Sequence, residues 1–366
     1  MKMRAAVVFE PSGSFEIKEV DLAAPKETEV LIKMVGTGIC GTDSIARHQG
    51  IPTPLPAVFG HEGAGIVQEV GSAVRDIKVG DRVLISFYSC GCCDRCRIGQ
   101  PTMCHDYERV NLFGGTYSDG TKRISYEGQP ISTFFGQSTL AEYCVTDAEN
   151  CVVIDDDSLD IGIMGPLGCG LQTGAGAIIN KLRPQVGDSF AAFGCGAVGF
   201  AALIMAKNAG CSEVIAVDIV DERLKMAKEF GATHVINSKN VDPVAEIKKI
   251  TGGGANCSID ATGNTKVMRQ AMNCLRPRGT CGIIGSGGPS ELNFIPQTEL
   301  MDPAIHLVGI IEGESIPKVF IPRLIKLWKE GRFPFDKLVK EYKFEDVNQA
   351  IDDAAKGVVV KPIIRF

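Results

Sequence analysis

The chain has 366 residues, of which 45% are hydrophobic and 22% charged, and its formal net charge is −6. This length predicts one very large or two ordinary domains, and the composition excludes an intrinsically disordered chain. The acidic balance, without a dense block of Lys or Arg, excludes nucleic acid as a partner. No apolar run reaches the ~18 residues of a membrane span, and the run after Met1 is too short for a secretory signal. We therefore expect a soluble, cytoplasmic protein with no membrane partner, whose fourteen cysteines are thiols and metal ligands.

The first part of the chain is predicted to be rich in β-structure. Short β-branched runs bounded by glycine or proline indicate strands at 29–35, 65–70 and 81–87. Turns are expected between them at 70–71 and 80–81.

The segment 89–104, SCGCCDRCRIGQPTMC, is conspicuous for its five cysteines. The spacing C-x2-C-x2-C-x7-C suits one tetrahedral Zn²⁺, and its members are Cys90, Cys93, Cys96 and Cys104. Four thiolates leave no open position for a substrate and give the centre a net charge of about −2, which makes it a poor Lewis acid. We therefore expect a structural zinc here, with unliganded loop cysteines as the alternative and Cys92 as a bystander.

After about residue 170 the pattern changes to alternating strands and helices. The expected strands are 189–193, 213–218, 233–237 and 256–261, and the expected helices are 197–209, 221–230 and 243–250. This alternation predicts a parallel sheet with crossover helices. The tail adds a helix over 318–330 and a closing strand in GVVVKPIIRF.

A G-x-G-x-x-G motif follows the first of these strands. The cofactor-binding residues expected in it are Gly194, Gly196, Ala197, Val198 and Gly199. Taken alone, the motif fits any glycine-rich loop. Here a strand precedes it, a helix follows, and Asp218 ends the next strand 19 residues after Gly199. This context predicts a dinucleotide site, because the glycines let a pyrophosphate approach the free N–H groups of the helix.

Asp218 predicts NAD rather than NADP. Its carboxylate can accept hydrogen bonds from both ribose hydroxyls, and it repels the additional phosphate of NADP. Ile219 and Val220 provide no cation that offsets this repulsion, and Arg223 is expected to lie along the adenosine.

Three residues far apart in the sequence offer a second ligand set. Cys40, His61 and Cys169 supply two thiolates and one imidazole, which neutralise Zn²⁺ and leave a fourth position for water or substrate. Spacing alone does not establish this trio, because a buried cysteine is more often a small hydrophobic side chain.

The motifs GICGTD, GHEGAGIV, the four-cysteine loop, GPLGCGLQTGAG and GCGAVG occur in this order, and the chain thereby resembles the zinc-dependent medium-chain alcohol dehydrogenases over essentially its whole length. The resemblance implies an α/β protein with a GroES-like β-rich catalytic domain and an inserted Rossmann domain, a doubly wound parallel sheet. We expect the catalytic domain over 1–170, with 313–366 returning to it, and the NAD-binding domain over 171–312. The branch that looks most similar is the aryl- and allyl-alcohol (benzyl alcohol, geraniol) dehydrogenases, through the segments 134–143, 165–177, 310–315 and 320–339.

The resemblance implies roles around a catalytic zinc held by the trio. Glu62 resembles the acid that approaches the metal during ligand exchange. Asp43 matches the carboxylate that orients the zinc histidine, although capping of the following helix would also explain it. Thr42 matches the hydroxyl that takes the substrate proton. Together with the cysteine loop, two Zn²⁺ per chain are expected.

Two positions depart from the family pattern. Ile45 stands where many members carry the histidine that ends the proton relay, and we interpret the nearby His48 as an ordinary polar residue rather than a replacement. Gly41 stands where relatives often have a basic residue on the pyrophosphate. The phosphates are then expected to rely on backbone N–H groups and on Lys361.

The resemblance also suggests a substrate pocket. Thr173 and Val198 match positions that press on the nicotinamide ring, and the expected substrate walls are Phe87, Phe113, Phe135, Ile284 and Ile311. Such apolar walls suit a benzyl or prenyl-type alcohol better than a polyol, whose hydroxyls need polar partners. We expect reversible oxidation of an aromatic or allylic primary alcohol to its aldehyde, with a polyol, secondary-alcohol or glutathione-adduct (formaldehyde) dehydrogenase as the alternative.

Two interpretations from other classes are weaker. A zinc-ribbon protein that presents the loop to nucleic acid conflicts with the acidic charge and with the cofactor motif. A zinc-free NAD(P)H reductase has no use for the open trio. The apolar stretch 304–311 and exposed strand edges suggest a homo-oligomer, a dimer or a tetramer, besides the small-molecule alcohol or aldehyde partner.

Overall fold

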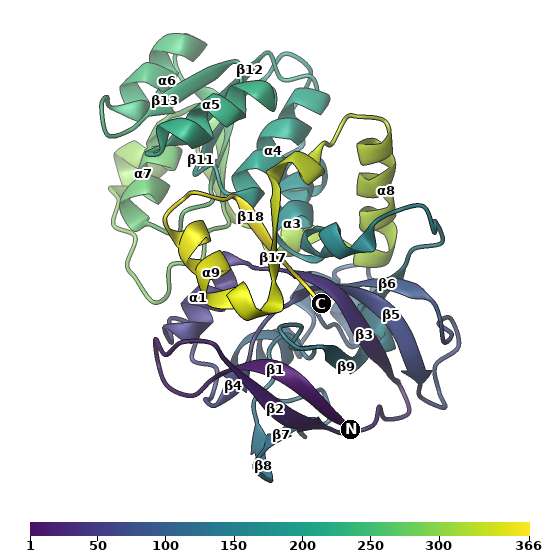
Figure 1. The fold of residues 1–366 in the computed structure, drawn as a ribbon. Helices are drawn as coiled ribbons and strands as arrows, with labels where there is room; N and C mark the ends of the chain where they lie inside the picture. Colours follow the sequence, from purple (N-terminus) through teal and green to yellow (C-terminus); the bar gives the residue numbers. More distant parts are fainter. The chain divides into compact units, whose positions relative to one another are not determined.

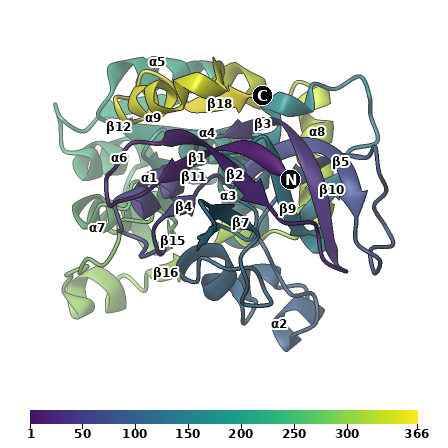
Figure 2. The same ribbon diagram turned by 60° about the horizontal axis from the view of Figure 1, so that its bottom comes forward.

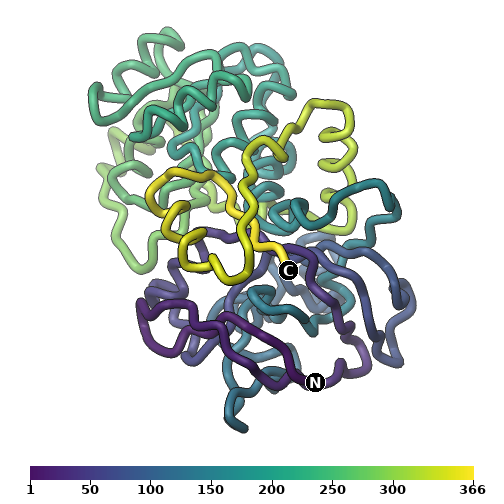
Figure 3. Tube along the Cα trace, in the orientation of Figure 1, coloured from purple at the N-terminus to yellow at the C-terminus, as the bar shows by residue number.

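The computed structural model describes residues 1–366 and separates into two compact units. The first unit contains Met1–Cys169, Ile316–Lys326 and Phe335–Phe366, and the second contains Gly170–Ser315 and Leu327–Pro334. Both chain ends therefore belong to the first unit. Figure 3 shows the final segment returning beside the N-terminal part of the chain.

The first unit is built on two sheets, as its β-branched runs predict. One has five strands in the order β4 (Ala57–Val58), β1 (Lys2–Val8), β2 (Glu16–Leu22), β7 (Ile124–Tyr126) and β8 (Gln129–Ile131). The other follows the order β10 (Cys151–Val153), β6 (Arg82–Ile85), β5 (Glu62–Val70), β3 (Glu29–Gly38), β18 (Lys361–Arg365) and β17 (Val339–Lys343), with β9 (Tyr143–Asp147) also on β3. Its helices are α1 (Gly41–Arg47), α2 (Asp94–Arg97), α9 (Val347–Ala355) and most of α8 (Pro317–Lys329).

Strand β3 is the centre of this unit because both of its faces are covered. Successive side chains of a strand point to opposite faces. Val30, Ile32 and Met34 pack into one buried apolar cluster, whereas Leu31 packs into another. The end of β3 leads directly into Cys40 and α1, so a rigid strand positions the first candidate ligand.

The second unit contains a parallel sheet, and this confirms the predicted βα alternation. The strand order is β13 (His234–Asn237), β12 (Glu213–Asp218), β11 (Ser189–Phe193), β14 (Ala255–Asp260), β15 (Leu275–Ile283) and β16 (His306–Gly309). Its helices are α3 (Gly170–Gly176), α4 (Ala197–Asn208), α5 (Asp221–Glu229), α6 (Pro243–Thr251) and α7 (Thr265–Asn273). Figure 1 shows α4 to α7 around the strands of this sheet.

The strand order reverses between β11 and β14, and this reversal marks a ligand-binding position. In a doubly wound parallel sheet, ligands bind outside the carboxyl ends of the strands at such a point. Gly194 directly follows β11, and Asp218 is the last residue of β12. None of the helices combines the length and apolar character that crossing a bilayer requires.

Candidate functional site

A buried cluster of potential metal ligands forms in the first unit. Cys40, His61, Glu62 and Cys169 each offer one ligand atom, and these atoms lie within 4.8 Å of one another. Cys40 lies between β3 and α1, His61 and Glu62 lie at the start of β5, and Cys169 follows the short helix η5 (Gly165–Gly168). The structure thus brings the sequence-predicted trio together with the predicted acid, and we call these four residues the buried cluster.

His61 presents one ring nitrogen to this cluster. Its Nδ1 lies 2.9 Å from Oδ1 of Asp43, while its Nε2 is buried and has no hydrogen-bond partner. The ring of Phe135 stacks on the imidazole with centroids 4.3 Å apart. A buried nitrogen without a partner is costly, whereas a metal ion would satisfy it. The two cysteines and the free Nε2 therefore fit a Zn²⁺ ion.

Asp43 fixes the orientation of the His61 ring and of the backbone around it. Besides His61, its carboxylate accepts backbone N–H bonds from Cys40 and Gly60, each at 3.0 Å. Asp43 is buried in the first turn of α1. Both interpretations weighed for this residue are compatible with these contacts, because one carboxylate caps the helix start and fixes the imidazole.

Glu62 is paired with a residue from the opposite end of the chain. The Lys361 Nζ lies 2.8 Å from both Glu62 oxygens and donates to the Ile39 carbonyl at 3.1 Å, and both side chains are buried. Burial raises the pKa of Glu62, and the ammonium of Lys361 opposes this rise. A side chain on Gly38 would come within 2.0 Å of the Glu62 carboxylate, so glycine is required there.

This ion pair bears on the role expected of Lys361. An ammonium has three N–H donors, and these contacts use all three. The phosphate contact stays a prediction, and it requires one of these bonds to break. The sequence offered no signal for the pairing, because Glu62 on β5 and Lys361 on β18 are brought together by the strand β3, which pairs with both β5 and β18.

The surroundings of the buried cluster favour the thiolate form of Cys40. The hydrogen bond with Cys169 lowers the pKa of the Cys40 thiol against the effect of burial, and His61 adds to this lowering. Burial disfavours the charged form of His61, but Asp43 and Cys40 outweigh it and raise the pKa of the imidazole. A thiolate that forms readily is the species that binds zinc.

Two polar residues, Thr42 in α1 and His48 just after it, are the candidates for moving the substrate proton. The Thr42 Oγ1 lies 3.6 Å from the Cys40 Sγ, at the edge of the buried cluster. His48 is exposed just after α1, and its Nδ1 lies 2.7 Å from the Ser12 Oγ. Ile45 packs against the apolar core. His48 is thus held by the loop around Ser12, which favours its interpretation as an ordinary polar residue.

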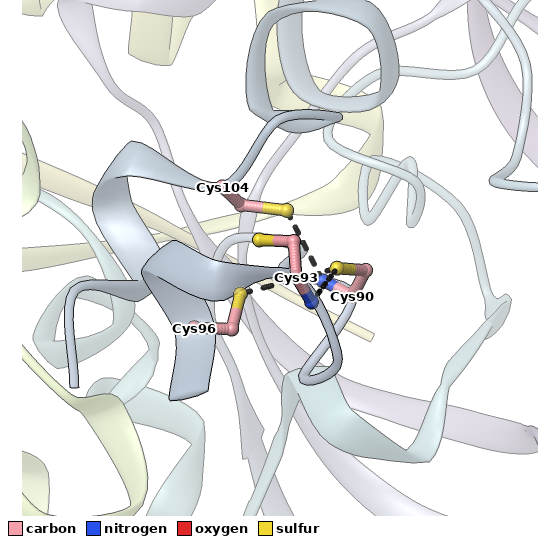
Figure 4. Close-up of side chains that lie close together, drawn as sticks. All are labelled: Cys90, Cys93, Cys96 and Cys104. Atoms are coloured by element: carbon pink, nitrogen blue, oxygen red, sulfur yellow. Dashed lines mark hydrogen bonds between the residues drawn. The ribbon is translucent and has the colours of Figure 1, made fainter. Parts of the chain in front are cut away.

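The four spaced cysteines of the loop also converge, and we call them the loop cluster. Their sulfur atoms lie within 4.8 Å of one another, and Figure 4 shows the four side chains gathered around α2. The sulfurs of Cys90 and Cys96 are 4.0 Å apart. Zn–S bonds of about 2.3 Å in a tetrahedron separate sulfurs by about 3.8 Å, so the spacing fits zinc.

The backbone of the loop cluster stabilises thiolates. The N–H of Cys90 donates to the Cys104 sulfur, and the N–H of Cys93 donates to the Cys90 sulfur, both at 3.3 Å. Backbone N–H groups of Cys96 and His105 lower the pKa of Cys93 to about 6. Cys92 is exposed and outside the group. Figure 2 shows α2, which carries part of the cluster, on a loop of the first unit.

In the second unit, the glycine-rich turn has the geometry that a phosphate requires. Gly194 has φ of 95°, a conformation that only glycine adopts at little cost. A side chain on Gly199 would come within 1.9 Å of the Gly194 carbonyl, so α4 starts close to β11 only because Gly199 has none. Nothing lies within 4 Å of a side chain added at Gly196, which caps α4 and leaves open space at its positive end.

Asp218 makes more hydrogen bonds to the backbone of the protein than the sequence suggested. Its carboxylate accepts N–H bonds from Cys195 at 2.6 Å, Ile219 at 2.7 Å and Val220 at 3.0 Å. A carboxylate has about four lone-pair sites, so about one remains for a ribose hydroxyl rather than two. The nearby Arg223 has a buried Nε without a hydrogen-bond partner, which makes it a donor available to a ligand.

The residues expected around the nicotinamide and the substrate differ in exposure. Thr173 is buried in α3, and a side chain on its neighbour Gly174 would come within 2.0 Å of the Val198 carbonyl, so α3 and the start of α4 pack closely. Of the expected walls, Phe87 and Phe135 are buried in the first unit. Phe113 and Ile311 are exposed, and Ile284 is half-buried. Their role as pocket walls stays a prediction.

The chain matches two family models. The alcohol dehydrogenase GroES-like domain matches residues 26–156, and the zinc-binding dehydrogenase domain matches residues 197–329. It is 41% identical over 365 residues to the geraniol dehydrogenase of Castellaniella defragrans, covering 99% of this chain and 97% of that protein. The chain belongs to the zinc-binding alcohol dehydrogenase family. The alcohol dehydrogenase class-P of Arabidopsis thaliana is 35% identical to this dehydrogenase over 377 residues, covering 100% of this chain and 97% of the relative.

Solved structures support the same assignment. The benzyl alcohol dehydrogenase of Acinetobacter calcoaceticus matches this dehydrogenase with a TM-score of 0.95 and 42% identity, covering 100% of this chain and 99% of the other. An alcohol dehydrogenase zinc-binding domain protein of Burkholderia ambifaria matches with a TM-score of 0.96 and 43% identity, at the same coverage. The predicted α/β fold, a GroES-like part and a Rossmann-type parallel sheet, is confirmed.

Proposed function

We propose that this dehydrogenase reversibly oxidises an aromatic or allylic primary alcohol to its aldehyde, with NAD as hydride acceptor and one Zn²⁺ in each of its two clusters. The observation that carries the proposal is the buried His61 Nε2, which has no hydrogen-bond partner and belongs to the same cluster as Cys40 and Cys169. The catalytic domain would span 1–170 and 313–366, and the NAD-binding domain 171–312. The compact units differ from these bounds because the second unit also contains Gly170, 313–315 and Leu327–Pro334.

The residues of the buried cluster divide the work. When bound, zinc makes the alcohol hydroxyl more acidic, and NAD accepts a hydride. Two thiolates, from Cys40 and Cys169, match the charge of a divalent cation, and Asp43 keeps the His61 Nε2 directed at it. The Thr42 hydroxyl at the edge of the cluster would accept a hydrogen bond from the substrate hydroxyl and, as it takes that proton, would pass its own proton to water.

The remaining residues bind the cofactor and hold the fold. Four thiolates in the loop cluster close a zinc shell, so that site stabilises the loop rather than reacting. Backbone N–H groups after Gly196 hold the phosphates, and Lys361 contributes if its pair with Glu62 opens. Asp218 favours NAD over NADP, because its carboxylate repels a ribose phosphate, and Arg223 lies along the adenosine.

The substrate class rests on the relatives and on the apolar character of the expected walls. Geraniol is an allylic and benzyl alcohol an aromatic primary alcohol, and dehydrogenases of these names are 41% and 42% identical to this chain. Five apolar side chains at the expected wall positions would leave polyol hydroxyls without partners, which costs binding free energy.

The test is a screen of cofactor reduction over benzyl, cinnamyl, prenyl, short aliphatic and polyol alcohols. We expect the highest kcat/KM with a benzyl or allylic alcohol and NAD. A polyol as the best substrate would refute the substrate class, and equal efficiency with NADP would refute the role of Asp218. Metal analysis should give about two zinc ions per chain, whereas one ion confined to the loop cluster would refute the catalytic site.

A further inference from the structure

The turn η8 (Glu312–Glu314) in the second unit has an unusual backbone. Glu312, Gly313 and Glu314 have φ of 48°, 64° and 48°. For the two glutamates this left-handed region is unfavourable, and such a conformation persists only where the surroundings hold it. The turn belongs to the segment 310–315, IIEGES, in which only Ile311, an expected substrate wall, has a role in the proposed function.

The helix η6 (Ala177–Leu182) and the end of α3 hold the turn in place. Asn180 donates to the Gly313 carbonyl at 2.9 Å, and Lys181 pairs with Glu314 at 2.5 Å. A side chain on Gly176 would come within 2.3 Å of the Gly313 carbonyl, so the backbones are in close contact. The strained turn is therefore a fixed part of the second unit.

The two glutamates of the turn lie in different environments. The Glu314 side chain is 33% exposed and forms its ion pair with Lys181. Glu312 is buried, and its Oε2 accepts hydrogen bonds from the Thr173 hydroxyl at 3.3 Å and from the Gln172 amide at 3.4 Å. Since the φ values of the two residues are equal, Glu314 is a natural control for Glu312.

The position of Glu312 beside the carboxyl end of the sheet links it to the cofactor. It follows β16 at the carboxyl end of the parallel sheet, the edge at which ligands bind. The strand order reverses between β11 and β14. Asp218 ends β12 in one half of the sheet, whereas β16 belongs to the other half. A dinucleotide that places its adenosine at Asp218 places its nicotinamide toward β14–β16, the half that carries Glu312.

We propose that the Glu312 carboxylate, held against Thr173, makes this site select the oxidised cofactor. The inference rests on the proposed function, in which Thr173 contacts the nicotinamide ring. That ring is cationic in NAD⁺ and neutral in NADH. A negative charge that is buried close to the ring therefore stabilises bound NAD⁺ and leaves bound NADH nearly unaffected. We expect it to raise the affinity for NAD⁺ relative to NADH by about tenfold.

The test compares dissociation constants for NAD⁺ and NADH, measured by calorimetric titration of the full chain. In E312Q the side chain keeps its shape and an acceptor oxygen but loses its charge. We expect the Kd for NAD⁺ to rise about tenfold and the Kd for NADH to change less than about threefold. The Kd for ADP-ribose, which lacks nicotinamide, should stay the same.

The matched control is E314Q, which removes a charge from the same turn without touching Thr173. Its ratio of the two Kd values should equal that of the wild type. If E312Q does not fold, Glu312→Gly is the second variant, because glycine accepts the left-handed backbone and also removes the charge. It should shift the ratio in the same direction.

The outcomes separate this inference from the proposed function. An unchanged ratio in E312Q and Glu312→Gly, or an equal shift in E314Q, would overturn the role of Glu312 while leaving NAD binding in place. A wild-type protein that binds neither NAD⁺ nor NADH would overturn the proposed function, and the role of Glu312 with it.

Discussion

The loop cluster and the buried cluster use similar ligands, but the chain builds them differently. All four sulfurs of the loop cluster come from the one segment 90–104, and neighbouring backbone N–H groups support them. The buried cluster combines three segments from distant parts of the sequence, and charged side chains support it. One cluster is local and partly exposed, whereas the other is tertiary and almost fully buried.

This difference shows that the ligands and their surroundings together decide what a metal site can do. A closed shell of four sulfurs can only hold a loop together. The buried cluster has two cysteines, one oriented histidine and an acid that already has a partner in Lys361. Substitutions in the two clusters should therefore separate chemistry from stability.

Cys169→Ser should have the largest effect on activity. It removes one thiolate from the buried cluster, so we expect kcat/KM for alcohol oxidation to fall at least about 100-fold. Bound zinc should fall from about two ions per chain to about one, while the loop cluster keeps its metal. If the variant kept both ions and normal activity, the buried cluster would not be the catalytic site, and the proposed difference between the two clusters would be wrong.

Asp43→Asn should weaken the same site without removing a ligand. The amide has one acceptor oxygen in place of two, yet His61, Cys40 and Gly60 all donate to Asp43. We expect a loss of about 10–100-fold in kcat/KM or zinc affinity. Steady-state kinetics and zinc titration measure it, and a loss below about twofold would mean that the imidazole needs no carboxylate.

Cys93→Ser should lower stability rather than chemistry. Loss of the loop zinc removes its contribution to folding, so we expect the Tm to fall by about 5–10 °C, while the buried cluster keeps its metal. Differential scanning calorimetry with metal analysis measures both. The control is Cys92→Ser, which should leave Tm and zinc content unchanged because Cys92 lies outside the cluster. An emptied buried cluster in a folded Cys93→Ser protein would contradict the separation.

His48→Ala should have the smallest effect. The side chain is exposed and bonded to Ser12, so we expect kcat near neutral pH to fall less than about tenfold. A proton-relay group contributes 100-fold or more. A loss of that size in the pre-steady-state rate of hydride transfer would make His48 the relay residue in place of the one missing at Ile45.

Much of the fold was predictable from local pattern. The strand over Ser189–Phe193 and the strand over Glu213–Asp218 match their predicted limits, and the helix predicted at 221–230 ends one residue earlier. The two strands are short continuous apolar runs, the helix has apolar residues at helical spacing, and all three end at or beside glycine or acidic residues, which are local signals. The sheet of β1, β2, β4, β7 and β8 was not predicted. Three of its strands, β4, β7 and β8, have only two or three residues, and the pairings of β4 with β1 and of β7 with β2 cross long stretches of sequence.

The candidate site shows the same limit. The sequence by itself determined the loop cluster, the glycine turn and Asp218, because their chemistry depends on spacing within one segment. Only the tertiary structure placed Lys361 on Glu62 and Glu312 on Thr173, and only it left the His61 Nε2 without a partner. These contacts join residues that are far apart in the sequence, so no spacing within one segment predicts them. Each affects stability because a buried charge or polar atom must find its partner within the fold.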